Sequence, residues 1–175
     1  MFRFLDIDDE DESISLLRQK CIEQGATCAD GSVPVVTHTI CNFLPPDSRD
    51  ASRFEYGSPF WVYRLLTEGR FDLPHHPLDF PIPIDPIEPT APALVISSTG
   101  FSLSERELIE AMITLAGAIF TSHLTCRNTH LIVPVKDENA PLNPSEKERY
   151  AVEWGVEIRD VAWLERCFLN WKWES

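Results

Sequence analysis

The stretch SSTGFSLSER, residues 97–106, carries side chains that suit the binding of an anion. It follows the apolar run ALVIS (93–97) and precedes a segment with helical spacing, which places it at a strand-to-helix corner. Thr99 offers a hydroxyl, Gly100 lets backbone N–H groups approach a ligand, and Arg106 lies one turn into the helix. These residue types predict an anion site. The rest of the chain must indicate whether the anion is a substrate or a covalent modification of a partner protein.

The elements around this corner occur twice in the chain. Residues 16–40 and 108–132 share a helical segment, a glycine and a strand at a constant offset of 92 positions, seen at Gly25 and Gly117 (117 − 25) and at the pairs Thr37-His38 and Thr129-His130 (129 − 37). A constant offset across three kinds of feature indicates an internal repeat.

A later landmark of the repeat is a tryptophan-bearing helix. Trp61 and Trp163 are 102 positions apart (163 − 61), and the polar stretch 135–149 accounts for the extra residues as a surface loop leading into a helix. Each unit then runs strand, helix, short strand, strand, connection, helix. This order predicts an α/β fold with a small parallel sheet in each unit.

A proline-rich segment separates the two units. Seven of the 14 prolines lie in 72–92, which excludes a helix or an inner strand and predicts a stiff linker packed along a surface through Phe80, Ile82, Ile84 and Ile87. The expected boundaries are repeat 1 at 1–71, the linker at 72–92 and repeat 2 at 93–175. His75 and His76 are interpreted as solvated linker residues rather than metal ligands.

Charge and cysteine content limit the classes of partner. Asp plus Glu number 28 against 15 Lys plus Arg, a formal charge of −13, so we expect no direct DNA binding through phosphate attraction. Five cysteines without a C-x-x-C pair, and no apolar signal or membrane-spanning run, indicate a reduced intracellular protein outside the membrane. Cys21, Cys41 and Cys167 fall in apolar patterns and are expected to be buried thiols.

The chain lacks the common sequence signatures of enzymes. G-x-G-x-x-G, the P-loop, H-E-x-x-H and G-x-S-x-G are all absent, and the corner carries neither a cysteine nucleophile nor paired carboxylates. The prediction is therefore a non-enzymatic protein with no cofactor and no metal. The two Thr-His strands and the two tryptophans are expected to be structural.

The two glycines, the two T-H-x-I strands and the two tryptophan helices together resemble the BRCT repeat, here as a tandem pair. The resemblance is strongest in the second unit, where TGFSLSER, LAGA, NTHLIV and K-x-x-x-A-x-x-W-G-V (147–156) appear in order. Among BRCT proteins the pattern is most similar to the multi-BRCT scaffolds of the PTIP family with its fungal relatives, and next to the topoisomerase-II-binding protein family.

The resemblance implies a phosphate pocket at the corner. It assigns a hydroxyl to Thr99, a backbone N–H to Gly100 and the cations to Lys147 and Arg106, provided that Lys147 folds back beside the corner. A phosphoserine or phosphothreonine, with about −1.5 to −2 charges, needs such converging donors. Lys147 is expected at the surface, so that Lys147→Glu removes binding with little change in stability.

The first unit lacks this set of residues. Six carboxylates lie between Asp6 and Glu12, where the hydroxyl and glycine belong, and they either stabilise the following helix through its dipole or form an acidic face for a basic partner. The connection 41–57 is short and polar, so the helix between its strands is expected to be reduced or missing. Recognition is therefore predicted to centre on repeat 2.

The function implied is a nuclear scaffold in the response to DNA damage or replication stress. Its repeat 2 is expected to bind a Ser/Thr-phosphorylated or acidic-motif peptide of a repair, replication or chromatin protein. The alternative is a scaffold that binds an unmodified peptide, or itself, through the linker, the acidic face or the inter-repeat groove. The partner, the oligomeric state and the number of further repeats in a longer protein stay open.

Overall fold

The structure is a computed structural model of the 175-residue chain. It describes residues 2–4, 12–29, 36–44, 55–83, 87–88, 92–135 and 144–174. The chain divides into two compact units, Met1–Ile84 and Asp85–Ser175, which we call unit 1 and unit 2.

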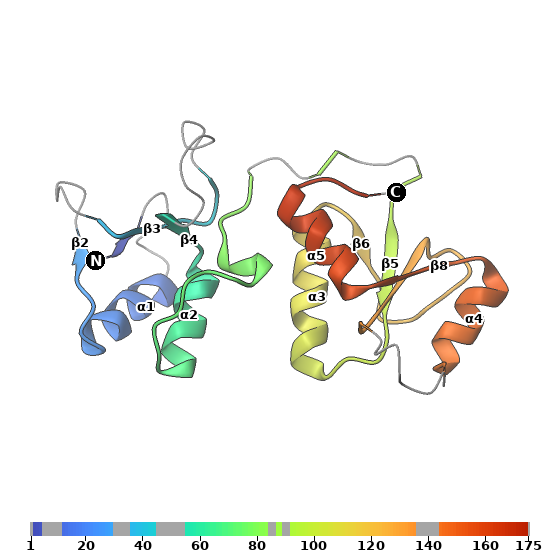
Figure 1. Ribbon diagram of the computed structural model, residues 1–175, viewed down its shortest axis with the longest axis horizontal. Helices are drawn as coiled ribbons and strands as arrows, with labels where there is room; N and C mark the ends of the chain where they lie inside the picture. The colour runs from blue at the N-terminus through green and yellow to red at the C-terminus, as the bar shows by residue number, and fades with distance from the viewer. Residues whose placement is uncertain are drawn as a thin grey trace. The chain divides into compact units, whose positions relative to one another are not determined.

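Unit 1 has a four-stranded parallel sheet in the order β2-β1-β3-β4. Its helices α1 and α2 lie on one face of this sheet (Figure 1). The elements are β1 (Phe2–Phe4), α1 (Glu12–Glu23), β2 (Cys28–Ala29), β3 (His38–Ile40), β4 (Tyr56–Gly57), α2 (Pro59–Glu68) and the 3₁₀ turn η3 (Pro77–Asp79).

Unit 2 repeats this arrangement with the order β6-β5-β7-β8, again all parallel. Helices α3 and α5 lie on one face of the sheet and α4 lies on the other (Figure 1). The elements are β5 (Val95–Ser98), α3 (Leu103–Leu115), β6 (Ile119–Phe120), β7 (His130–Val133), α4 (Glu146–Trp154), β8 (Glu157–Asp160) and α5 (Val161–Asn170). The predicted fold class is confirmed.

The internal repeat extends to single hydrogen bonds. Gly25 and Gly117 follow the first helix of their units with the same left-handed φ of +86°. The indole Nε1–H of Trp61 donates to Asp72 O (3.0 Å), and that of Trp163 donates to Glu174 O (3.2 Å). Both acceptors lie 11 residues after the tryptophan, beyond the end of its helix.

The expected core residues are buried. Trp61 is 0% exposed and Trp163 is 3% exposed, and each packs against the histidine of its T-H-x-I strand, with ring centroids 5.0 Å apart for His38 and 5.1 Å for His130. The thiols of Cys21, Cys41 and Cys167 are also buried. The structural interpretation of the tryptophans and of these three thiols is confirmed.

The proline-rich segment departs from the linker expectation. Pro77–Asp79 form a 3₁₀ turn, with proline at its first position where no backbone donor is needed, so the exclusion of any helix was wrong for these residues. Phe80 and Ile87 are buried, which agrees with packing along a surface. His76 is half-buried, and its Nδ1 accepts from Leu78 N (3.2 Å), so the interpretation of this histidine as solvated was wrong.

Other predictions fall partly outside the described residues. Of the acidic stretch only Glu12 is described, in the first turn of α1, and of the connection 41–57 residues 45–54 are not described. Among the described helices, none combines the length and apolarity that crossing a bilayer requires.

Candidate functional site

The corner after β5 has two hydrogen-bond donors available to a ligand. The Thr99 N–H donates to Ile132 O of β7 (3.0 Å), which holds the corner against the neighbouring strand. The Thr99 hydroxyl and the Gly100 N–H have no hydrogen-bond partner among the residues that the structure describes. Thr99 is half-buried and Gly100 is exposed, so a ligand can reach both groups.

Gly100 is required here for two reasons. Its φ is +84°, in the left-handed region, and a Cβ built on it would lie 2.9 Å from Pro134 Cδ. Any other residue would therefore meet both backbone strain and a steric clash with the segment that follows β7. This close approach gives the corner a fixed backbone path.

The helix after the corner begins with a capping box. Ser102 is the N-cap of α3, its Oγ accepts from Glu105 N (3.4 Å), and the Glu105 carboxylate accepts from Ser102 N (2.8 Å). Arg106 follows Glu105 on this first turn and is exposed. Its side chain has no ion pair within the described ranges.

Lys147 lies on α4, and its side chain extends to the end of β5 next to the corner. Its Nζ donates to Ser98 O (2.9 Å), to Ser122 O (2.8 Å) and, at a longer distance, to Ser97 Oγ (3.4 Å). Ser145 caps α4 and places Lys147 in the first helical turn, where the helix dipole disfavours a cation. The ammonium instead binds acceptors that belong to the sheet.

The expectation that Lys147 lies at the surface was wrong. The side chain is half-buried, and its hydrogen bonds satisfy Ser97, which is fully buried, and the carbonyl of Ser98 at the end of β5. Loss of these bonds leaves buried acceptors without donors, so replacement of Lys147 costs stability as well as charge.

Two effects lower the pKa of the Lys147 ammonium. Burial lowers the pKa of Lys147, and the positive charge of Arg106 lowers it further. The Arg106 charge therefore acts on the Lys147 ammonium from a different helix. An anion between the two groups would relieve their repulsion, which a neutral ligand would not do.

The structure thus brings together Thr99, Gly100 and Lys147, and it places the charge of Arg106 close enough to act on Lys147. Sequence reasoning missed Ser97, Ser98 and Ser122 as partners of Lys147. Ser97 had a signal, because its hydroxyl lies near the end of an otherwise apolar strand. Ser98 and Ser122 contribute only their carbonyls, which no side-chain pattern identifies. In the described part of the chain, no group of three or more His, Cys, Asp or Glu is placed to hold a metal ion.

Comparison with known proteins gives matches to BRCT proteins. The model of the twin BRCT domain family matches residues 94–163. The chain is 31% identical over 111 residues to PAX-interacting protein 1 of Mus musculus, which covers 63% of this chain and 10% of that protein. It is 26% identical over 160 residues to PAX-interacting protein 1 of Danio rerio, with 88% of this chain and 16% of that protein covered.

Solved structures share the fold along the whole chain. The BRCT3,4 region of S. pombe Rad4 superposes with a TM-score of 0.72 at 22% identity, over 99% of this chain and 92% of that chain. Yeast Rtt107 superposes with a TM-score of 0.74 at 16% identity, over 99% of this chain and 41% of that chain. Residues 94–163 thus match the twin BRCT family, and the whole chain has the two-unit fold of a tandem BRCT structure.

Proposed function

We propose that this chain is a non-enzymatic interaction module that binds a Ser/Thr-phosphorylated peptide at the corner of unit 2. The single observation that carries the proposal is the pair of cations beside the free donors of the corner. The charge of Arg106 lowers the pKa of Lys147, and Arg106 has no carboxylate partner among the described residues, in a chain with a formal charge of −13. A phosphate supplies the missing negative charge and three acceptor oxygens.

The roles of the four residues follow from their positions. The Thr99 hydroxyl and the Gly100 N–H donate to phosphate oxygens at the end of β5, and Arg106 adds a charged fork from α3. Lys147 supplies its charge while it stays bound to the sheet, or exchanges its long contact to Ser97 Oγ for a phosphate oxygen. Charge-assisted bonds of this kind contribute about 1.5–3 kcal/mol each, which is tenfold or more in affinity.

The biological setting is part of the same proposal. The likeness to multi-BRCT scaffolds supports a nuclear role in the response to DNA damage or replication stress. Solved structures of yeast Rtt107 include complexes with Mms22 and with Slx4, at TM-scores of 0.73 and 0.74 to this chain. By analogy, the partner of this chain is a protein of DNA repair, replication or chromatin.

The test uses a degenerate phosphoserine and phosphothreonine peptide library, with its unphosphorylated counterpart, on the full chain. Arg106→Glu is the decisive variant, because the exposed side chain has no ion pair to lose within the described residues; it should weaken retention of phosphopeptides at least about tenfold without changing the melting temperature. Lys147→Glu should weaken binding and lower the melting temperature. Arg149→Glu, an equal charge change at an exposed position of α4, is the matched control and should bind normally.

The alternative function is a scaffold that ignores phosphate. It predicts equal retention of the two libraries, or nuclear-extract partners that persist after phosphatase treatment and in the Arg106→Glu variant. Either result, with the variant folded, would refute the phosphate-binding proposal.

A further inference from the structure

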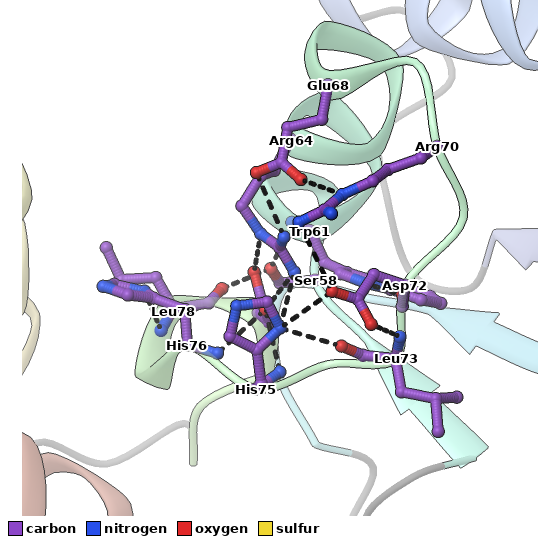
Figure 2. A network of polar contacts seen from close by, with 11 residues as sticks. Ser58, Trp61, Arg64, Glu68, Arg70, Asp72, Leu73, His75, His76 and Leu78 are labelled. Carbon is purple, nitrogen blue, oxygen red and sulfur yellow. Dashed lines mark hydrogen bonds and ion pairs between the residues drawn. The ribbon is translucent and has the colours of Figure 1, made fainter.

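The segment 72–83, which we call the strap, is bound to helix α2 of unit 1. In the first turn of the helix, Trp61 Nε1 donates to Asp72 O (3.0 Å). At the N-cap, Ser58 N donates to Asp79 O (2.8 Å) and the Ser58 hydroxyl donates to Leu78 O (2.5 Å). The strap therefore returns from the end of α2 to its first turn and its cap (Figure 2).

The centre of this contact is a buried ion pair. Asp79 is 0% exposed and receives two hydrogen bonds from Arg64, from Nε to Oδ1 (3.0 Å) and from Nη2 to Oδ2 (2.6 Å). The backbone N–H groups of His75 and His76 donate to Oδ2 at 3.0 and 2.9 Å. Figure 2 labels the three residues that supply these donors, Arg64, His75 and His76. A bidentate pair of this kind recognises a carboxylate by its geometry as well as by its charge.

Apolar side chains flank the aspartate on both sides. Leu78 and Phe80 are 7% and 8% exposed, and Pro81 is fully buried. A buried cluster of unit 1 consists of Phe2, Leu17, Cys21, Ile40, Trp61, Val62 and Leu65. The strap adds its own buried apolar side chains to this unit.

The strap continues to the edge where β3 ends. Ile82 N donates to Asn42 O (3.2 Å), and Leu44 N donates to Ile82 O (2.9 Å), so one residue of the strap pairs with the segment after β3. By the repeat offset of 92, Asn42 corresponds to Pro134 (42 + 92), which contacts the corner at Gly100 in unit 2. In unit 1, the strap thus pairs with the segment after β3. The equivalent segment of unit 2, after β7, borders the candidate site.

The second repeat shows that this contact is not required by the fold. Arg166 of α5 is at the position equivalent to Arg64 (64 + 102), yet its side chain is 54% exposed and pairs with the surface carboxylate of Glu174 (3.3 Å). Arg64, in contrast, is only 14% exposed. The burial of Arg64 therefore comes from the strap and not from the BRCT fold.

We propose that α2 and the end of β3 form a peptide-binding site on unit 1, which the chain fills with its own strap. The geometry specifies the ligand as an extended segment with an aspartate between two apolar residues, next to proline. A partner with such a segment binds by displacing the strap, since an empty site would expose Arg64 and the apolar surface that the strap covers together. The site needs no phosphate and is independent of the function proposed for unit 2.

The test measures exchange of the strap for an added peptide on the full chain. Asp79→Asn weakens the internal strap by removing the charge that Arg64 binds. A fluorescent peptide of residues 72–83 should then bind this variant, and the same peptide carrying Asp79→Asn should bind at least about tenfold more weakly. The wild-type chain should bind neither peptide strongly, because a tethered strap competes at a high effective concentration.

Two further variants separate the possible explanations. Adding Arg64→Gln to Asp79→Asn should abolish the preference for the aspartate peptide, whereas Arg166→Gln, the matched change in unit 2, should leave it intact. Lys147→Glu should have no effect, so failure of this proposal and failure of the phosphate proposal are distinguishable. Equal binding of the two peptides, or no binding by a folded Asp79→Asn chain, would overturn the proposal.

Hydrogen exchange of the wild-type chain keeps the test decisive if Asp79→Asn fails to fold. The amides of Ser58, Ile82 and Leu44, which bond to or from the strap, should exchange through an opening of lower free energy than the amides of β3. Exchange of both sets only through the same global opening would show that the strap cannot leave a folded unit, and the peptide site would be refuted.

Discussion

At the scale of single residues, identical side chains at equivalent repeat positions have different physical roles. Arg64 and Arg166 both extend from the last helix of their unit, but the first binds the fully buried Asp79, whereas the second is exposed and binds the half-buried Glu174. An exposed pair contributes at most about 1 kcal/mol, whereas breaking a buried pair leaves an uncompensated charge. The environment and not the residue type decides which arginine matters for stability.

Asp79 should make unit 1 sensitive to acid. Although burial by itself raises the pKa of this carboxyl, the bonds from Arg64, His75 N and His76 N outweigh it and hold the pKa below its usual value of 3.8. Because the folded pKa is the lower one, its stabilisation is complete above the unfolded value and is lost as pH falls through the folded pKa.

The measurement is the urea midpoint of the wild-type chain and of Asp79→Asn from about pH 6 down to about pH 2.5. The wild type should be more stable at about pH 6 by about 1–3 kcal/mol, and this difference should shrink below about pH 4. Other groups near the carboxylate, namely His75, His76, Asp72 and Glu68, are present in both proteins, and the Asp79 charge raises the pKa of His76 in the wild type alone. A difference that stays constant over this range would contradict the assignment.

At the scale of elements, the corner of unit 2 is built by one glycine and one helix cap. Gly100 brings the chain from β5 to α3 against Pro134, and Ser102 with Glu105 starts the helix that carries Arg106. Lys147 comes from a third element, α4, which has its own capping box. The position of the donors relative to one another thus depends on three local structures that form independently.

Substitution of two glycines separates backbone strain from the close approach at the corner. Gly155→Ala, at φ +70° with open space around a built Cβ, should cost about 1–2 kcal/mol through strain alone. Gly100→Ala has the same strain at φ +84° and adds the 2.9 Å contact with Pro134 Cδ, so its cost should be larger. Thermal unfolding of the two variants measures the difference, and equal costs would mean that Pro134 moves freely.

The same pair tests the link between the corner and binding. Gly100→Ala should also weaken the retention of phosphopeptides, because it shifts the N–H that is proposed to donate to the phosphate. Gly155→Ala, at the far end of α4, should retain phosphopeptides normally.

At the scale of the whole molecule, charge separates peptide recognition from nucleic-acid binding. The chain has a formal charge of −13, and its two cations at the corner of unit 2 form a local exception. Long-range repulsion disfavours a polyanion, whereas a single phosphate needs only the local field of the corner.

The chain should therefore leave the electrophoretic mobility of double-stranded DNA unchanged at about 0.15 M salt, where the Debye length is about 8 Å. The assay mixes the protein at micromolar concentration with a labelled duplex. Binding of a phosphopeptide by the same preparation is the control that shows the protein to be active. A salt-dependent shift of the duplex would show a basic surface that the described residues do not reveal.

The sequence by itself determined the repeat, the parallel α/β fold and the buried tryptophans. These features depend on hydrophobic periodicity and on the spacing of glycines and tryptophans, which are visible along the chain. It also named Thr99, Gly100, Arg106 and Lys147 as a set, although whether they bind phosphate stays a prediction.

Only the tertiary structure decided the partners of charged groups that are far apart in sequence. Lys147 lies 49 and 25 positions from the Ser98 and Ser122 carbonyls that hold it, and backbone acceptors leave no mark in a residue pattern. In the sequence Asp79 is one acid in a proline-rich linker, and its burial against Arg64 follows from the path of the strap along α2. A buried charge must be paired with a partner of opposite charge, and which charges are buried is decided only when the chain folds.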